Sequence, residues 1–492
     1  MPGLAPAVAR RGAVTEEAPL ASSPPAFAAP RWEHHDRTHL QLEVDYPAGP
    51  HAYCWEAYFF IPQSFRVGPA SYDAQRLYED FVSYVRRPAR EHTLERVFAV
   101  SLPNLERVLA EGDLDVCGQE ARRLACSVRA SIRAAMHDIE SGQCADDDAI
   151  SAIVERAGAV VPRARRVFAD VLQGPEPMRT TAAWVIEDLS MMCEQFLGRV
   201  ALVVDGPAAT EAREQALRVV RARETWSRFQ RPPAGHLTSR EVERIEFMRH
   251  TLKRFTSSVL WLDFEVTDPT RWAKQILFSL AASCAMAFAV IAALWNGDPL
   301  GSPELGVWLV VAIVAYAVKD RIKAWLQAMF SRLLRRHFPD RRWFVRAVDE
   351  AKPVATVDET TRFRDFEELP GDVLAARRMT RRHPLEEIAR PEGVLWHRKV
   401  VRLHGEGQPS GLTEVFRLDL ARWLANTDDP KTKLVLADIE QAELRQVTAP
   451  RVYNIAVVHR AWRRDDQAPP PAWKRERIVV SRKGIRRLET IC

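Results

Sequence analysis

The side chains best suited to metal chemistry lie close together in residues 33–39. Glu33, His34, His35, Asp36 and His39 offer imidazole nitrogens and carboxylate oxygens, which are the ligands that zinc and other transition metals take from proteins. Their spacing matches no specific metal motif, and polar residues ahead of a first strand are usually solvated loop residues. We therefore assign them no metal, and the sequence predicts no bound cofactor.

The sequence contains none of the compact motifs of common enzymes. No lysine follows a glycine, which excludes a phosphate-binding P-loop, and G-x-G-x-x-G is absent. No serine has the G-x-S-x-G setting of a nucleophile elbow, and no histidine precedes a glutamate as in zinc proteases. The acidic triplet 146–148 suits the start of a helix better than a calcium loop. No catalytic residue is predicted, and the chain is more simply explained as a non-enzyme.

Two basic groups have the charge to contact nucleic acid or anionic lipid. They are Arg377, Arg378, Arg381, Arg382 and His383, and then Arg460, Arg463 and Arg464. Acidic residues lie close by, and the whole chain of 492 residues carries a net charge of only +5. Solvated surface is the simpler explanation, so nucleic acid is not an expected partner.

The composition favours a bacterial protein of a reducing compartment. Basic residues are almost all arginine, with the first lysine at Lys253, as in proteins from GC-rich genomes. The seven cysteines are scattered and odd in number, so no disulfide framework is implied. Residues 1–31 are rich in alanine and proline, have no signal-peptide core and are expected to form a disordered tail.

Two apolar segments near the middle of the chain predict a transmembrane helical hairpin over residues 272–318. Residues 276–295 carry no charge and would span about 30 Å as a helix, the thickness of a hydrocarbon core. Residues 305–318 would span only about 21 Å as a helix, so the residues that flank them must complete the span. Membrane lipid is therefore an expected partner.

Charged and aromatic flanks orient this hairpin. Basic residues stand before the first segment and after the second, while the turn between them holds only acidic residues, so both long arms and both termini are expected in the cytoplasm of a bacterial inner membrane. The residues expected at the membrane boundaries are Arg271, Trp272, Lys274, Trp295, Trp308, Tyr316, Lys319, Arg321 and Lys323.

Small residues in the first segment indicate close helix packing. Ser279 and Ser283 lie four residues apart, and so do the members of the longer series Ala281, Ala285, Ala289 and Ala293. These residues can pack the two helices of one hairpin against each other, or they can associate hairpins of different copies. Both interpretations stay open, and the second would give a homo-oligomer.

Residues 319–338 predict an amphipathic juxtamembrane helix. Its apolar stripe includes Ile322, Trp325 and Met329, with arginines opposite. It can lie on anionic lipid or pack on a cytoplasmic domain, and we favour packing. Another helix is predicted to begin at the capping pair Thr238 and Glu241. Its apolar residues form a short seam, which favours ordinary packing against a neighbouring helix.

The arms on either side predict an α+β membrane protein. Residues 32–267 would form a mainly helical cytoplasmic domain, with a β-hairpin at 32–62, helices near 71–86, 103–141, 147–173, 177–205 and 209–227, and a strand near 260–267 that joins the hairpin in a small sheet. Residues 343–492 would form a β-rich cytoplasmic domain, a sandwich or open barrel, in which Phe416 and Leu418 face inward and Gly484 supplies a turn with positive φ.

These features favour an inner-membrane scaffold or sensor that binds a protein partner in the cytoplasm. One alternative is an enzyme whose catalytic residues are dispersed along a cytoplasmic arm, which a deep polar pocket would indicate. Another is a pore or membrane effector built from associated hairpins.

Overall fold

The computed structural model describes residues 30–69, 71–72, 74–144, 146–227, 234–295, 305–347, 352–378, 392–404, 411–438, 443–466 and 469–491, with Phe27 and Glu440. Most of the predicted tail and the turn at 296–304 therefore lie outside the described residues. The helices are α1 (Ala74–Asp80), α2 (Leu94–Arg96), α3 (Leu102–Glu111), α4 (Leu114–Glu140), α5 (Asp147–Val167), α6 (Ala169–Gln173), α7 (Met178–Val203), α8 (Pro207–Glu224), α9 (Ser239–Ser257), α10 (Arg271–Trp295), α11 (Leu305–His337), α12 (Gly371–Arg378) and α14 (Ala421–Leu424).

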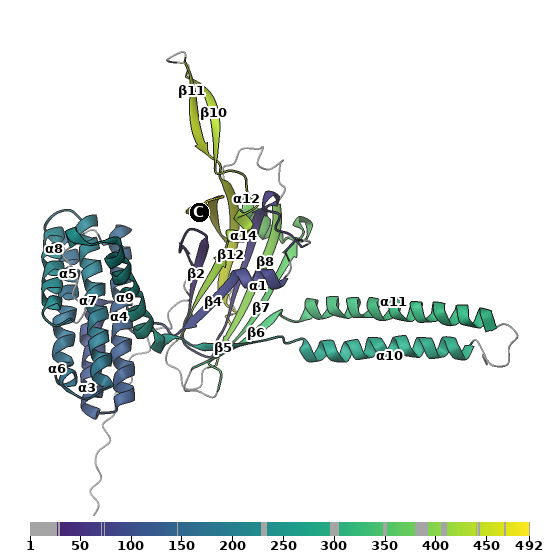
Figure 1. Ribbon diagram of the computed structural model, residues 1–492, viewed down its shortest axis with the longest axis horizontal. Helices are drawn as coiled ribbons and strands as arrows, with labels where there is room; N and C mark the ends of the chain where they lie inside the picture. The colour runs from purple at the N-terminus through teal and green to yellow at the C-terminus, as the bar shows by residue number, and fades with distance from the viewer. Residues whose placement is uncertain are drawn as a thin grey trace, which may run out of the picture.

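Two facing sheets form a β-sandwich at the centre of the molecule (Figure 1). The strands are β1 (Arg31–His34), β2 (His39–Tyr46), β3 (Ala52–Pro62), β4 (Phe81–Arg86), β5 (Asp263–Thr267), β6 (Arg341–Arg346), β7 (Ala355–Arg364), β8 (Glu392–Leu403), β9 (Leu412–Asp419), β10 (Lys431–Asp438), β11 (Glu443–Pro450), β12 (Tyr453–Arg463), β13 (Lys474–Ser481) and β14 (Gly484–Ile491). One sheet has the order β14-β13-β12-β3-β8-β7-β6-β5 and the other the order β1-β2-β9-β4.

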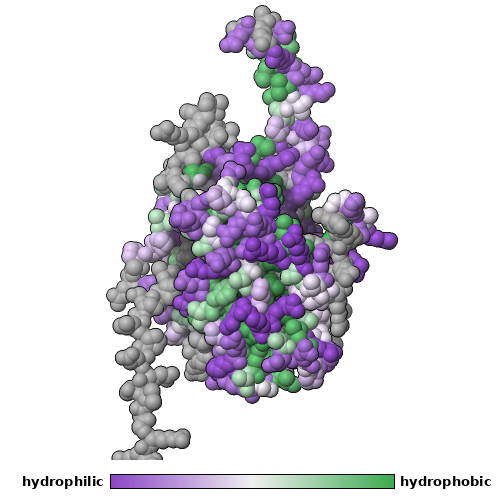
Figure 2. All heavy atoms as spheres, turned by 90° about the vertical axis from the view of Figure 1, so that its left-hand side faces the viewer, coloured by the Kyte–Doolittle hydropathy of each residue, from purple (hydrophilic) through white to green (hydrophobic). Residues whose placement is uncertain are grey.

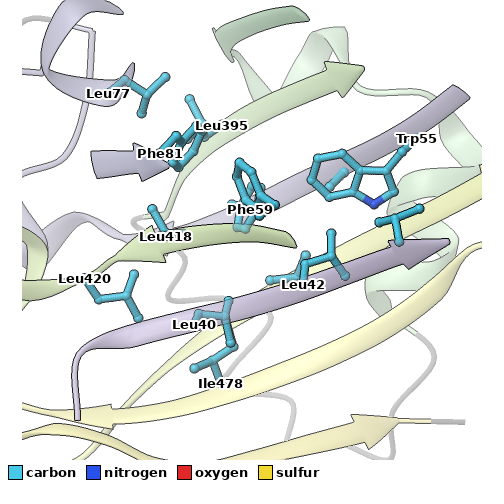
Figure 3. Close-up of a cluster of buried hydrophobic side chains, with 14 of the residues drawn as sticks. Leu40, Leu42, Trp55, Phe59, Leu77, Phe81, Leu395, Leu418, Leu420 and Ile478 are labelled. Atoms are coloured by element: carbon cyan, nitrogen blue, oxygen red, sulfur yellow. The ribbon is translucent and has the colours of Figure 1, made fainter. Parts of the chain in front are cut away.

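Alternate residues of the strands fill the space between the two sheets. Leu40 and Leu42 of β2 and Leu418 of β9 face Phe59 of β3 and Leu395 of β8, and all five are essentially inaccessible to solvent (Figure 3). This period of two is the pattern expected for strands with one buried face. On the other side of the large sheet, α12 covers a smaller apolar cluster that includes Phe60 and Val373.

The strand partners differ from the predicted division into an N-terminal and a C-terminal domain. The expected β-hairpin at 32–62 does not form, because β2 pairs with β1 and β9 while β3 pairs with β8 and β12 in the opposite sheet. The strand at Asp263–Thr267 joins the large sheet beside β6, at its edge, and does not pair with β2 or β3. Both ends of the chain therefore build one sandwich.

A helical bundle is inserted between β4 and β5. The predicted helices at 103–141, 147–173, 177–205 and 209–227 correspond to α3 with α4, α5 with α6, α7, and α8. They share a core of their own, and α9 packs on α4 and α7, so the short seam makes ordinary helix contacts. Residues 71–86 were expected to be one helix, but only α1 is helical, because Phe81, Ser83 and Val85 face the sandwich as strand β4.

Two hairpins project from the sandwich. One consists of α10 and α11, which leave it side by side from the paired strands β5 and β6 (Figure 1). The other is the two-stranded arm β10–β11, which was not predicted. Figure 2 shows this arm at the top of the molecule, where hydrophobic residues stand among hydrophilic ones.

Candidate functional site

The α10–α11 hairpin carries a long apolar segment that is mostly exposed. Within Arg271–Ala292, only 11% of the residues of the most apolar stretch are buried. A helix of this composition in a soluble core would be mostly buried. Within the described part of the chain, α10 is the one helix long and apolar enough to cross a membrane, and α11 does not reach that limit.

The basic and aromatic residues predicted at the membrane boundaries lie at both ends of α10. Arg271, Trp272 and Lys274 form its first turn, next to the sandwich, and Trp272 is exposed. The Lys274 ammonium lies 2.8 Å from the Asp268 carboxylate. Trp295 ends α10 at the far end of the hairpin and is 89% exposed.

The corresponding residues of α11 lie near its middle. The Lys319 ammonium stands 3.9 Å from the centre of the Tyr316 ring, a cation–π contact, and 3.8 Å from the Asp320 carboxylate. Arg321 and Lys323 are exposed. Trp308 belongs to α11, but its side chain lies outside the described residues.

The four residues predicted to pack the helices are not brought to one face. Ala285 is buried together with Ala281, and Ala289 is half-buried. Ser279 and Ser283 are exposed, and the Ser283 hydroxyl donates to the Ser279 carbonyl oxygen at 3.0 Å. The close contact between α10 and α11 therefore lies along the alanines.

The sequence did not reveal a group of buried polar side chains between the two sheets. We call it the inner polar cluster and define it as Ser83, Glu359, Thr361, His397, Lys399 and Glu414. The Lys399 ammonium donates to Glu414 Oε1 and to Ser83 Oγ (2.8 Å) and lies 3.5 Å from Glu359 Oε1. His397 Nδ1 shares a hydrogen bond of 2.7 Å with the Thr361 hydroxyl, and its Nε2 lies 3.5 Å from Glu359 Oε1.

Burial and charge shift the proton equilibria in the inner polar cluster. Burial raises the pKa of the Glu359 carboxyl, although Lys399 opposes the shift. Burial and the neighbouring Lys399 charge hold the pKa of His397 well below its ordinary value. Burial opposes the charge on Lys399, but Glu359 and Glu414 raise its pKa. The cluster is thus an ion pair with a neutral histidine, enclosed by aromatic rings such as those of Phe81 and Phe416.

A signal for the inner polar cluster does exist in the sequence. His397 and Lys399 alternate with the same period as the buried Leu395 and Val401 of β8, and Glu414 has the phase of Phe416. A charged residue on the apolar phase of a strand indicates a buried partner, since unpaired buried charges are strongly unfavourable. The partner strand could not be identified from the sequence.

A polar cavity of about 540 Å³ opens at the edge of the sandwich near α1 and α14. Its lining includes Arg66, Ser71, Tyr72, Arg76, Arg422 and Asn426. Arg422 donates two hydrogen bonds, of 3.2 and 3.1 Å, to Glu79 Oε2, so part of the positive charge is neutralised. The inner polar cluster does not line this cavity.

The remaining predicted groups are engaged with protein neighbours. His39 pairs with Asp36 at 2.9 Å, and nowhere in the described residues do three potential metal ligands come together. In the basic groups, Arg377 pairs with Glu392 at 2.7 Å, and Arg460 stacks on the Trp473 ring at 3.9 Å. Residues 381–383 and the side chain of Arg378 lie outside the described residues.

Comparison with known proteins gives no family for this arrangement. The chain matches no family model, no curated protein and no solved structure.

Proposed function

We propose that the chain is a membrane-attached binding protein without enzymatic activity, whose helical hairpin inserts into a bilayer. The observation that carries this proposal is the exposed apolar surface of α10. Only 11% of the residues in its most apolar stretch are buried. Exposed apolar surface of this extent is rare on soluble monomers and costs about 25 cal/mol per Å² in water.

The proposed orientation follows from the connection to the sandwich. Because α10 and α11 both join the paired strands β5 and β6, the sandwich and the bundle stand at the same end of the hairpin. The basic residues Arg271 and Lys274 lie at that end too, which under the positive-inside rule is the cytoplasmic end. The expected location is thus a bacterial inner membrane, with both folded units in the cytoplasm.

The β10–β11 arm supports binding of a protein partner. Its exposed apolar side chains are Leu434, Val435, Leu436, Leu444 and Val447. Among the described strands, β10 and β11 pair only with each other, so both edges offer free backbone groups. An isolated two-stranded sheet is marginally stable alone, so an extended segment of a partner protein added at one edge would stabilise it.

Vesicle flotation of the purified chain tests the membrane proposal. The control variant replaces residues 269–339 by a short Gly-Ser turn, which closes the β5–β6 pair where Thr267 stands opposite Arg342. We expect the full chain to float with vesicles and the variant to stay in the soluble fraction with its sandwich folded. A full chain that remains monomeric and dispersed in buffer without detergent would overturn the proposal.

The alternatives receive less support. Ala281 and Ala285 are buried within the hairpin, so part of the small-residue series that motivated a pore of associated hairpins already packs within one copy. The polar cavity beside Arg66 is the feature that an enzyme or small-ligand hypothesis would use, but the carboxylate in its lining, Glu79, already pairs with Arg422.

A further inference from the structure

The β10–β11 arm leaves the sandwich across the direction of the helical hairpin. In Figure 1 the hairpin extends to the right and the arm upward, and in Figure 2, which is turned about the vertical axis, the arm again points upward. With the hairpin inserted along the normal of a bilayer, the arm therefore runs along the membrane surface. A second copy of the chain in the same bilayer, rotated about the normal, then presents its own arm in the opposite direction.

The unpaired charges of the arm are divided between its two ends. Lys431 and Lys433 lie at the root of β10, and Glu440 and Glu443 lie near the tip. All four are exposed, and within the part of the chain that the structure describes none of them takes part in an ion pair. Two arms that run in opposite directions therefore bring the basic root of each beside the acidic tip of the other.

The other charged residues of the arm and its root already have partners. Across the two strands, the Asp438 carboxylate lies 3.8 Å from the Arg445 guanidinium. The root carboxylates Asp428 and Asp429 pair with arginines at 3.2 and 3.3 Å. The two lysines that lack an ion pair both belong to β10, which makes this strand the one that an acidic tip would meet.

β10 also offers the more complete edge for pairing. Among the described strands it pairs only with β11, so its other edge presents free backbone groups. β11 ends in Pro450, which has no N–H to donate. In the middle of β10, Leu434, Val435 and Leu436 are 43, 63 and 52% exposed. Cross-strand neighbours from an added strand would cover part of this apolar surface.

We infer that two copies of the chain associate through their arms, with β10 of one copy antiparallel to β10 of the other. The arms then form one sheet of the order β11-β10-β10-β11, which is more stable than two isolated two-stranded sheets. The eight residues of β10 span about 26 Å, so full overlap keeps the two sandwiches about one arm length apart. The inference rests on the proposed binding role of the arm and names a second copy as the partner.

Charge reversal in the full chain tests this pairing. Native mass spectrometry in mild detergent measures the dimer fraction at several protein concentrations. Lys431→Glu/Lys433→Glu is expected to weaken dimerisation about tenfold or more, because both lysines of each copy then face like charges. Glu440→Lys/Glu443→Lys is expected to weaken it similarly. An equimolar mixture of these two variants is expected to form mixed dimers, since an acidic arm then meets a basic arm.

The control reverses two exposed arginines of the bundle, Arg213→Glu/Arg244→Glu, and is expected to leave the dimer unchanged. A monomeric unmodified chain would overturn the inference. Dimers that persist in Lys431→Glu/Lys433→Glu would also overturn it, because the contact would then lie elsewhere, as on the helical hairpin. A chain that is monomeric but still floats with vesicles keeps its proposed membrane attachment, so the two failures are distinguishable.

A cysteine scan of β10 in vesicles locates the two-fold axis independently. Such an axis between identical antiparallel strands sets one residue opposite its own copy. With Cys144, Cys284 and Cys492 changed to serine, single cysteines are introduced from Val435→Cys to Ala437→Cys, midway between the basic and the acidic end of the strand. We expect one of the three to form a disulfide between copies more readily than the other two. Dimers without a cross-link at any of them would show that the β10 edges do not meet.

Discussion

At the scale of single residues, the inner polar cluster is the least ordinary feature of the sandwich. Lys399 is enclosed between two sheets whose inward residues are mostly apolar, and the Glu359 and Glu414 carboxylates lie beside its ammonium. Removing one member of a buried pair leaves the other without a partner, which is far more costly than removing both.

The first prediction concerns this balance. Lys399→Met is expected to lower the free energy of unfolding by about 3–5 kcal/mol, because it leaves the buried Glu414 carboxylate without a cation, with the Tyr46 hydroxyl as its remaining partner. Lys399→Met/Glu414→Leu is expected to recover part of the loss, because Glu359 still lacks the Lys399 charge. Chemical denaturation in mild detergent measures both, with the exposed Lys474→Met as the control. Equal losses in the single and the double variant would contradict the pairing.

The second prediction concerns pH. Because the folded state lowers the pKa of His397, its contribution to stability is complete above the unfolded pKa of about 6.5 and is lost as pH falls below that value. Each pH unit below it costs about 1.4 kcal/mol until the folded pKa is reached. His397→Gln is expected to flatten the fall in denaturation midpoint between pH 7 and pH 5. His236→Gln, an exposed control, should keep the slope of the unchanged chain, and an identical slope in His397→Gln would refute the prediction.

Local chemistry at single residues was predictable where it depends on neighbours in sequence. Gly484 adopts a φ of +123° in the β13–β14 turn, as expected, and a side chain there would meet the Arg37 carbonyl oxygen. The capping box of Thr238 and Glu241 starts α9 as expected. The partners of Lys399 were not predictable, because they come from strands that are distant in sequence.

At the scale of elements, helices were predicted better than strand pairs. A helix is specified by its own periodicity and caps, and the bundle helices fall close to their predicted limits. The sequence of a strand indicates which of its faces is buried, but it does not indicate which strand pairs with it. The alternation in β2 and β3 fits a local hairpin as well as two sheets, and nothing near Leu42 indicates its partner Phe416.

The third prediction concerns the contact between α10 and α11. Ala281→Leu/Ala285→Leu is expected to force the helices apart and to lower the stability of the hairpin by about 1–3 kcal/mol, the usual cost of overpacking. Ala287→Leu changes an exposed alanine of the same helix and is expected to have no effect. The midpoint of thermal unfolding in detergent measures both, and equal midpoints for the two variants would show that the alanines do not pack.

At the scale of the whole molecule, the chain is a sandwich with two long insertions. It leaves the sandwich at β4 and returns beside the same point, where Arg86 bridges to Trp261 and the Leu262 amide donates to the Val85 carbonyl oxygen at 3.1 Å. The bundle between these points has a core of its own. An inserted domain usually has a hydrophobic core of its own, and its first and last residues usually lie close together.

The fourth prediction follows from this arrangement. Residues 88–260 expressed alone are expected to fold as a cooperative helical bundle, measured by circular dichroism and thermal unfolding. Residues 339–492 alone are expected to aggregate, because β3 is missing from its place between β8 and β12 in the large sheet. Cooperative unfolding of the 339–492 fragment would show that the sandwich does not need the N-terminal strands.

The pairing of β3 with β8 also constrains how the chain is made. About 330 residues separate these strands, so at 5–20 residues per second a ribosome needs roughly 17–66 s to supply the partner of β3. The bundle and the hairpin both emerge during that interval, and the nascent strands meanwhile keep their edges open to aggregation. We therefore expect the hairpin to reach the translocation machinery before the sandwich has closed, and the nascent chain to depend on chaperones that hold strands β1–β4 until synthesis ends.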